Sequence, residues 1–262
     1  MSRYAIIAEY DGTAYHGWQI QESVPTIQQH LEEALAQLTQ SDIRITGSGR
    51  TDTGVHAIGQ VAHFDSTIEH FTTETYLRGL NSYLPDDILV KECVKVPANF
   101  HARYDAIRRD YTYIIATEPV AIGRQYCWSV YQDLNIQILH RLAEIILGAH
   151  DFYSFMSARS STENTVCTIV KSAWKTGANQ LRYSIYGNRF LHNMVRCLVG
   201  TMVEVARGRY SLEKFTDFLQ APDKEAPVIR APAAGLFLEK VHYKSVSLEN
   251  AGNRFGTIEN KR

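Results

Sequence analysis

Strand-like and helix-like residue patterns alternate along most of the chain, and this order constrains the fold more than any other feature. Helix-like segments repeat apolar residues every three or four positions, as Ile27, Leu31 and Leu35 do. Strand-like segments alternate apolar and polar residues, or are rich in β-branched and aromatic side chains. We therefore expect strands over residues 4–10, 59–65, 88–96, 111–116, 166–174, 181–186 and 235–243, and helices over 25–40, 73–84, 135–147, 190–207 and 211–220.

This interleaved order predicts an α/β (α+β) protein with two mixed halves. We place the first half at residues 1–105, the second at 106–244, and a polar tail at 245–262. The 262 residues suffice for one large domain or two smaller ones with a shared core. At the helix starts, Thr26 and Gln29 have the spacing of a capping box, and Asn135 and Ser211 are suited to cap the helices that follow them.

The composition is that of an ordinary globular protein, with 45% hydrophobic and 21% charged residues. The most apolar stretch, 190–206, is interrupted by His192, Arg196 and Glu204, so no segment has the pattern of a membrane span. The N-terminus shows no signal-peptide pattern. We therefore expect a cytoplasmic protein with no membrane contact.

Metal sites and nucleic-acid binding receive no support from composition. The histidines form no HExxH pair, and no CxxC pair occurs among Cys93, Cys127, Cys167 and Cys197. The net charge is -1, whereas nucleic-acid-binding proteins usually have a basic surplus. Any nucleic-acid partner would therefore require positive charge to be concentrated on one face.

The run from Gly47 to Ala57, GSGRTDTGVHA, is the most unusual segment of the chain. Its glycines and small polar residues predict a loop before the strand near residue 59. Arg50 lies two residues before Asp52, and such a pair can keep a partly desolvated carboxylate ionised, as nucleophilic catalysis by Asp requires. The spacings GxxxxGK[ST] and GxGxxG are absent, which argues against a nucleotide-phosphate loop. A plain turn around Asp52 is the alternative that these residues leave open.

This run resembles the GRTDAGVHA signature of TruA-type tRNA pseudouridine synthases. Further blocks resemble that family in the same order: YDGT at 10–13, GQV with HF at 59–64, FHARY at 100–104, RRDYTY at 108–113, DF with SF at 151–155, FLHNMVR at 190–196 and AGL at 234–236. The blocks span about residues 4 to 240, so the resemblance covers nearly the whole chain. Two departures are Thr53, where the family usually has alanine, and Cys167, where relatives commonly carry arginine.

The resemblance implies the pseudouridine synthase fold, with two mixed halves and largely antiparallel sheets joined around a central RNA-binding cleft. It implies isomerisation of uridine to pseudouridine at positions 38, 39 and 40 of the tRNA anticodon stem-loop. The reaction adds and removes no atoms, so no metal, cofactor or nucleotide is expected. Members of the family are homodimers, and dimerisation could assemble a positive cleft from chains whose net charge is near zero.

By the same resemblance, Asp52 is the catalytic carboxylate, which either attacks the ribose or helps to expel the uracil. Arg196 is expected to pair with Asp52, and Arg50 to guide the RNA backbone. Tyr111 is expected to stack on the flipped uracil, with Tyr113 left to packing. Core packing remains an alternative for Tyr111, and a loop arginine that caps carbonyl groups remains one for Arg50.

The remaining substrate contacts implied by the resemblance are an apolar pocket residue, Leu236, and an RNA-binding segment. Leu236 could equally be an ordinary core residue. The segment combines aromatic and basic residues, which suits stacking together with phosphate contact. It consists of Phe100, His101, Ala102, Arg103 and Tyr104, with Arg108 and Arg109 shortly after it.

Two other functions compete with this interpretation. A non-catalytic tRNA-binding protein would need the scaffold but not the combination of Asp52, Arg50, Tyr111 and Arg196. A different RNA-modifying enzyme is the second alternative. A methyltransferase would need a glycine-rich cofactor motif and a zinc deaminase would need PCxxC together with its HxE ligands, and the sequence contains neither the glycine-rich motif nor PCxxC. A synthase that acts on other uridines is the nearest enzymatic alternative.

Overall fold

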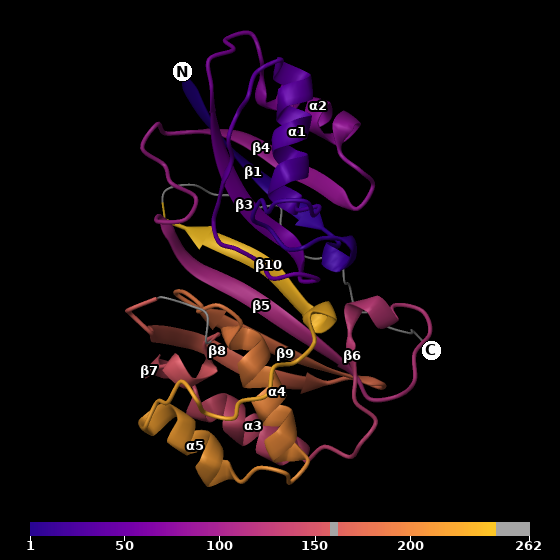
Figure 1. Ribbon diagram of the computed structural model, residues 1–262, viewed down its shortest axis with the longest axis vertical. Coiled ribbons are helices and arrows are strands. Elements are labelled where there is room, and N and C mark those ends of the chain that lie inside the picture. The colour runs from indigo at the N-terminus through magenta and orange to yellow at the C-terminus, as the bar shows by residue number, and fades with distance from the viewer. Residues whose placement is uncertain (158–161, 245–262) are drawn as a thin grey trace, which may run out of the picture.

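The computed structural model describes residues 1–157 and 162–244 (Figure 1). The tail proposed at 245–262 lies outside the described residues. Within them, ten strands form one sheet: β1 (Ser2–Tyr10), β2 (Thr46–Gly47), β3 (His56–Ser66), β4 (Ile88–Val96), β5 (Ala106–Ala116), β6 (Trp128–Ser129), β7 (Gly148–Asp151), β8 (Val166–Thr176), β9 (Gln180–Gly187) and β10 (Leu236–Tyr243).

The helices of the described chain fall into two groups, in chain order. They are α1 (Ile27–Thr39) and α2 (Thr73–Tyr83) in the first group, and α3 (Ile136–Ile145), α4 (Met194–Ala206) and α5 (Leu212–Gln220) in the second. Short 3-10 helices are η1 (Gly12–Ala14), η2 (Arg124–Tyr126), η3 (Tyr153–Phe155) and η4 (Ala233–Gly235). Every strand and helix predicted from the sequence is present, and the expected α/β (α+β) class with a largely antiparallel sheet is confirmed.

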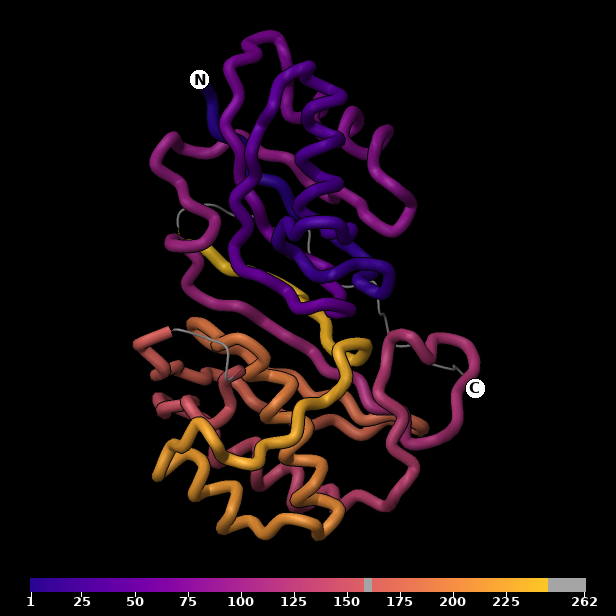
Figure 2. Tube along the Cα trace, viewed as in Figure 1, coloured from indigo at the N-terminus to yellow at the C-terminus, as the bar shows by residue number. Residues whose placement is uncertain are grey.

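The sheet is continuous, in the order β4-β1-β3-β10-β5-β9-β8-β7. Neighbouring strands are antiparallel except for β10 with β3 and β6 with β5. The last strand therefore joins the two halves: β10 pairs with β3 on one side and with β5 on the other. Figure 2 shows this late segment, in yellow, crossing between the indigo and orange halves of the chain.

Two hydrophobic cores lie on either side of this junction. The first includes Leu31, Leu35 and Tyr76 and contains residues of β1, β3 and β4. The second includes Tyr113 and Leu198 and contains residues of β8, β9 and the last three helices. Tyr111 packs against both cores. We therefore propose that the 1–105 and 106–244 division describes two cores within one sheet.

Two helix starts differ from the sequence predictions. Helix α4 begins at Met194 and not at residue 190, because Asn193 adopts a left-handed conformation with φ of 65°. The capping box at α1 is absent, since the Thr26 side chain makes no capping hydrogen bond. The first amides of α1 are used elsewhere: those of Ile27 and Gln28 donate to the carbonyls of Gly17 and Trp18.

The predicted caps of α3 and α5 are present. The side chain of Asn135 accepts from the amide of Ile138, and that of Ser211 accepts from the amide of Lys214. Among the residues that the structure describes, no helix combines the length and the apolar character needed to cross a membrane.

Helix α4 lies against the segment that leads into β10, and Gly200 makes this contact possible. A Cβ atom at Gly200 would lie 2.1 Å from the carbonyl oxygen of Ile229. We expect Gly200→Ala to lower the free energy of unfolding by about 1–3 kcal/mol, the usual cost of overpacking against rigid groups. Urea denaturation measures this change.

Gly79→Ala in α2 is the matched control, because both substitutions gain the same helix propensity. Its added Cβ would meet the side chain of Leu38, which is only partly buried and can turn away. Equal destabilisation by the two substitutions would contradict the tight packing of α4 against the segment around Ile229.

Candidate active site

The loop over residues 48–55 carries Asp52 and connects β2 to β3, as expected from its glycines. The amide of Val55 donates to the carbonyl of Asp52 at 3.1 Å, which closes a turn. Gly54 has φ of 75° within this turn, a conformation that glycine adopts without strain. The turn directs the chain into the central strand β3.

The segment after β1 holds this loop in place. The amide of Trp18 donates to the carbonyl of Thr51 at 3.1 Å, and the amide of Gly54 donates to the carbonyl of Tyr15 at 3.3 Å. The hydroxyls of Tyr10 and Thr51 share a buried hydrogen bond of 2.8 Å. These bonds restrain the backbone on both sides of the carboxylate.

Two side chains from the other half of the chain reach the Asp52 carboxylate. Nη1 of Arg196 lies 3.1 Å from Oδ2, and Nε2 of His192 lies 3.2 Å from Oδ1. The Asp52 side chain is 18% exposed and that of Arg196 is 12% exposed. The predicted pairing of Arg196 with Asp52 is therefore present as an enclosed ion pair.

The surroundings of Asp52 favour its charged form. Burial by itself raises the pKa of a carboxyl group. The hydrogen bonds and charges of His192 and Arg196 outweigh that effect, so the pKa of Asp52 lies below its usual range. An enclosed carboxylate that stays ionised can act as a nucleophile or stabilise positive charge.

The Arg196 guanidinium is fixed by more than its ion pair. Its Nε donates to the carbonyl of Ala231 at 2.9 Å, and its Nη1 also donates to Oδ1 of Asn193 at 3.2 Å. The amide of Ala231 in turn donates to the carbonyl of Arg196 at 3.0 Å. Arg196 therefore links α4, the segment before β10 and the Asp52 loop.

Tyr111 lies on β5, between β9 and β10. Its ring meets the edge of the Phe190 ring, with centroids 5.2 Å apart. Burial raises the pKa of Tyr111 to about 12, with the charge of Arg109 opposing and that of Asp52 adding to the shift. The phenol is therefore neutral at physiological pH. Tyr113, expected to pack, is buried, and its hydroxyl donates to the carbonyl of Pro232.

Two further predicted site residues have different environments. Leu236 is buried in the second core at the start of β10, opposite Tyr113. Arg50 is exposed, and among the described residues it makes no hydrogen bond or ion pair. Its guanidinium therefore caps no carbonyl group within residues 1–157 and 162–244, which was the alternative role.

The predicted RNA-binding segment divides into buried and exposed residues. Phe100 and Ala102 are buried in the first core. Arg103 and Tyr104 are exposed, the latter by 75%, and the Arg103 guanidinium lies over the Tyr104 ring at 5.7 Å. The half-buried ring of His101 lies 4.2 Å from that of Tyr104, and its Nδ1 accepts from the Arg103 amide.

Arg109 connects this segment to the Asp52 loop. Its guanidinium donates to the carbonyls of Ser48 at 2.9 Å, Arg103 at 3.0 Å and Asn188 at 2.9 Å, and to that of Ala106 at 3.2 Å. Burial lowers the pKa of Arg109. Its guanidinium is held by backbone carbonyls, two of which, those of Ser48 and Asn188, belong to segments distant in sequence.

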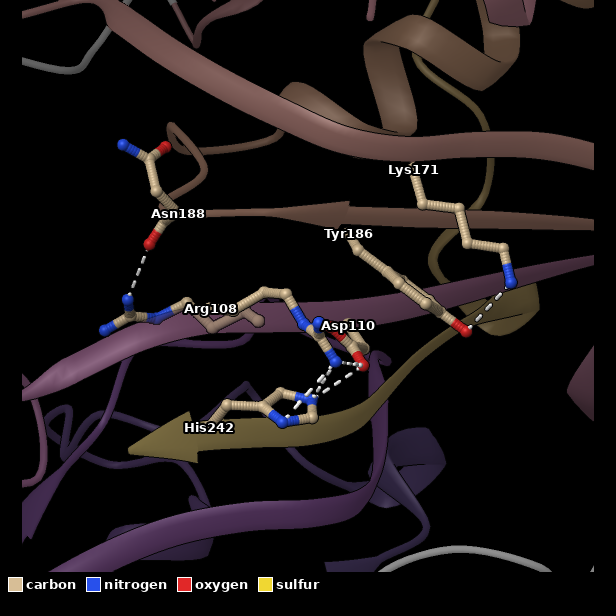
Figure 3. Close-up of polar contacts among 7 residues, drawn as sticks. Arg108, Asp110, Lys171, Tyr186, Asn188 and His242 are labelled. Atoms are coloured by element: carbon tan, nitrogen blue, oxygen red, sulfur yellow. Dashed lines mark hydrogen bonds and ion pairs between the residues drawn. The ribbon is translucent and has the colours of Figure 1, made fainter. Parts of the chain in front are cut away.

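Arg108 belongs to a different cluster, on the opposite side of β5 from Arg109. Figure 3 shows Arg108, Asp110 and His242 converging between β5 and β10. Nε of Arg108 lies 2.8 Å from Oδ1 of Asp110, and Nε2 of His242 lies 2.7 Å from Oδ2. Arg108 also lies over the Tyr186 ring at 5.3 Å. Because side chains alternate along a strand, Arg108 and Asp110 point away from the face of Tyr111.

His192 and Asn193 are site residues that were not predicted individually, and Arg109 was expected only as part of the RNA-binding segment. Each lies in a block that resembles the family, but pattern and spacing did not indicate its contacts. His192 lies four positions before Arg196, which would place both on one helical face. Helix α4 starts between them, so His192 approaches Asp52 from the preceding turn.

The two departures from the family pattern lie away from the carboxylate contacts. Thr53 is exposed, so its extra hydroxyl can be solvated by water. Cys167 is buried in the second core, so its thiol is not part of an RNA-binding surface. Over the described ranges, no group of three or more His, Cys, Asp or Glu side chains could hold a metal ion.

Comparisons with known proteins agree with the resemblance of the motifs. The model of the tRNA pseudouridine synthase family matches residues 6–105 and 142–244. The tRNA pseudouridine synthase A of an Exiguobacterium strain is 39% identical over 246 residues, which are 94% of this chain and all of that protein. Those of Halalkalibacterium halodurans and Bacillus subtilis are 42% and 40% identical, cover 95% and 89% of this chain, and are each matched over 96% of their own length. The chain belongs to the TruA-type tRNA pseudouridine synthase family, whose members are isomerases acting on tRNA.

Proposed function

We propose that the chain isomerises uridine to pseudouridine at positions 38, 39 and 40 of the tRNA anticodon stem-loop, with Asp52 as the catalytic carboxylate. The observation that carries the proposal is the enclosed ion pair between Asp52 and Arg196. A carboxylate in a largely desolvated site interacts strongly with charge that develops on the substrate.

The reaction requires the base to leave and return without loss of atoms. The bond between N1 of uracil and C1′ of ribose breaks, the base turns, and C5 bonds to C1′. The proton on C5 departs, and N1 ends with a proton. An ionised Asp52 can attack C1′, or it can assist departure of the uracil by stabilising positive charge on the ribose. Both routes require the charged form of Asp52, which Arg196 and His192 favour.

Tyr111 is proposed to receive the flipped base. Its ring is partly buried beside Phe190 and lies within the electrostatic influence of Asp52, so it offers a stacking surface for the base. A neutral phenol can also accept or donate a hydrogen bond to the base. Leu236 would form apolar support beneath this pocket, in keeping with its burial close to Tyr113.

RNA outside the pocket is proposed to meet exposed basic and aromatic side chains. Arg50 and Arg103 have guanidinium groups available for phosphate, while Tyr104 and His101 offer rings for stacking. Phe100 and Ala102 would anchor this segment from within the first core. We propose that no metal or cofactor takes part and that the enzyme works in the cytoplasm, where its tRNA substrate is found.

A homodimer is the proposed working form. The net charge of -1 offers little long-range attraction for tRNA. Two copies could combine their exposed basic groups, such as Arg50 and Arg103, into one positive cleft.

Asp52→Asn tests the catalytic assignment. We expect the variant to release tritium from tRNA labelled at C5 of uridine about a thousandfold more slowly than the wild type, since the amide cannot replace the carboxylate. Asp42→Asn, at an exposed position, is the matched control and should keep wild-type activity. Equal activity of Asp52→Asn and wild type, both folded, would exclude the proposed role of Asp52.

The proposed target positions make a separate prediction. In tRNA transcripts whose only uridine in the anticodon arm lies at position 38, 39 or 40, we expect one pseudouridine per transcript, mapped by carbodiimide modification and primer extension. Transcripts with cytidine at all three positions should remain unmodified in this arm. Modification confined to another arm would show that the enzyme acts on other uridines.

Sedimentation equilibrium tests the dimer. At micromolar concentration and in the absence of RNA we expect about twice the mass of one chain. Electrostatic assembly of the cleft further predicts that tRNA affinity falls steeply as salt rises. A mass equal to one chain, with tRNA binding retained, would contradict the dimer.

A further inference from the structure

The two oxygens of the Asp52 carboxylate have different surroundings. Oδ2 is 3.1 Å from Nη1 of Arg196, a guanidinium that also donates to Ala231 and Asn193 and is 12% exposed. Oδ1 is 3.2 Å from Nε2 of His192, whose side chain is 53% exposed. One oxygen is therefore held by an immobilised group, and the other is covered by a side chain that faces solvent.

The backbone at His192 is fixed although its ring is exposed. Leu191 and Asn193 on either side are buried, and the carbonyl of His192 accepts from the amide of Ser157 at 2.9 Å. The amide of Met194 donates to the carbonyl of Leu191 at 3.1 Å. The imidazole can therefore leave Asp52 by rotation of its side chain alone. Among the described residues, Asp52 is the only group that the His192 ring contacts through a hydrogen bond or ion pair.

Arg196 cannot withdraw from Oδ2 without breaking its bonds to Ala231 and Asn193 and leaving a buried charge without partners. His192 can withdraw at the cost of one contact, because water can solvate its exposed ring. Oδ1 is thus the oxygen whose protein partner a substrate can displace more easily.

We propose that His192 is a displaceable cap on the reacting oxygen of Asp52, which the incoming uridine removes while Arg196 keeps hold of the other oxygen. This inference rests on the proposed function of Asp52. In the free enzyme the cap keeps Oδ1 hydrogen-bonded and the carboxylate ionised. In the complex the same position is filled by the ribose or the base.

The cap has consequences for pH dependence. The ionisable groups that act on Asp52 are His192, Arg196 and Tyr111, with Cys197 nearby in α4. His192 lowers the pKa of Asp52, so its removal raises that pKa. The carboxylate would then take up a proton at higher pH. The acidic limb of the profile of kcat/KM, which reports the free enzyme, must therefore move to higher pH.

Kinetics of His192→Ala and His192→Gln, measured by tritium release, test this account. We expect His192→Ala to move the acidic limb upward and, at pH 8, to lower KM about fivefold, because substrate no longer displaces a hydrogen bond of roughly 1 kcal/mol. At that pH kcat should fall by less than about tenfold, far less than in Asp52→Asn. His192→Gln, whose amide can again donate to Oδ1, should return both KM and the acidic limb toward wild type.

His140→Ala, at an exposed position on α3, is the control and should match the wild type. Two kinetic results would overturn the cap. A loss of kcat in His192→Ala as large as that in Asp52→Asn would make His192 a participant in the chemistry. A pH profile and KM identical to those of His140→Ala would show that the contact has no role.

Histidine-ring NMR tests whether RNA displaces the His192 ring from Asp52, and it does not require turnover. It therefore distinguishes an error in the proposed role of His192 from an error in the proposed function of the enzyme. The signal of His192, identified by its loss in His192→Gln, should shift when an anticodon stem-loop RNA saturates the Asp52→Asn protein and the wild type. An unchanged His192 signal in the saturated wild-type complex would overturn the cap. Absence of tritium release by the wild type would instead count against the proposed function.

Discussion

The ion pair between Asp52 and Arg196 joins residues 144 positions apart, and the remaining geometry of the site depends on it. Both side chains are largely enclosed, so each charge compensates the other in a site with little water. Removing one partner from such a pair typically costs about 3–5 kcal/mol, because the other charge stays buried. The fold must therefore bring α4 and the Asp52 loop together before either charge is stable there. This requirement couples correct assembly of the two halves to formation of the reactive carboxylate.

The arrangement of β10 shows how the fold meets that requirement. The segment before this strand lies against α4 through the reciprocal bonds between Ala231 and Arg196, and the strand then pairs with β3 and β5. One chain segment thus contacts the helix that carries Arg196, the strand that follows the Asp52 loop, and the strand that carries Tyr111. Tyr111 packs against both cores, so the proposed stacking surface lies where the two halves meet.

The strands and helices could be predicted from the sequence because their apolar periodicity is local. Part of the site could be predicted because its motifs resemble those of a known family. Strand order, helix caps and side-chain contacts that depend on residues far apart in the sequence could not be predicted from local patterns or motifs. Alternation in residues 235–243 indicates a strand but does not reveal that it enters the centre of the sheet. The expected capping box at Thr26 is absent, and the Gln29 side chain that would have completed it donates to Glu33 instead. The contact of His192 was missed because the start of α4 depends on the backbone of Asn193.

Asp52 is an enclosed carboxylate whose charged form is favoured by Arg196 and His192. A carbon-13 NMR titration of aspartate carboxyl groups tests this most directly, with the Asp52 signal assigned by its loss in Asp52→Asn. We expect a titration midpoint below the usual value of about 3.9 for aspartate. In Arg196→Gln the midpoint should lie higher than in the wild type. A wild-type midpoint above the usual value would mean that burial outweighs the two partners, and it would contradict this account of the site.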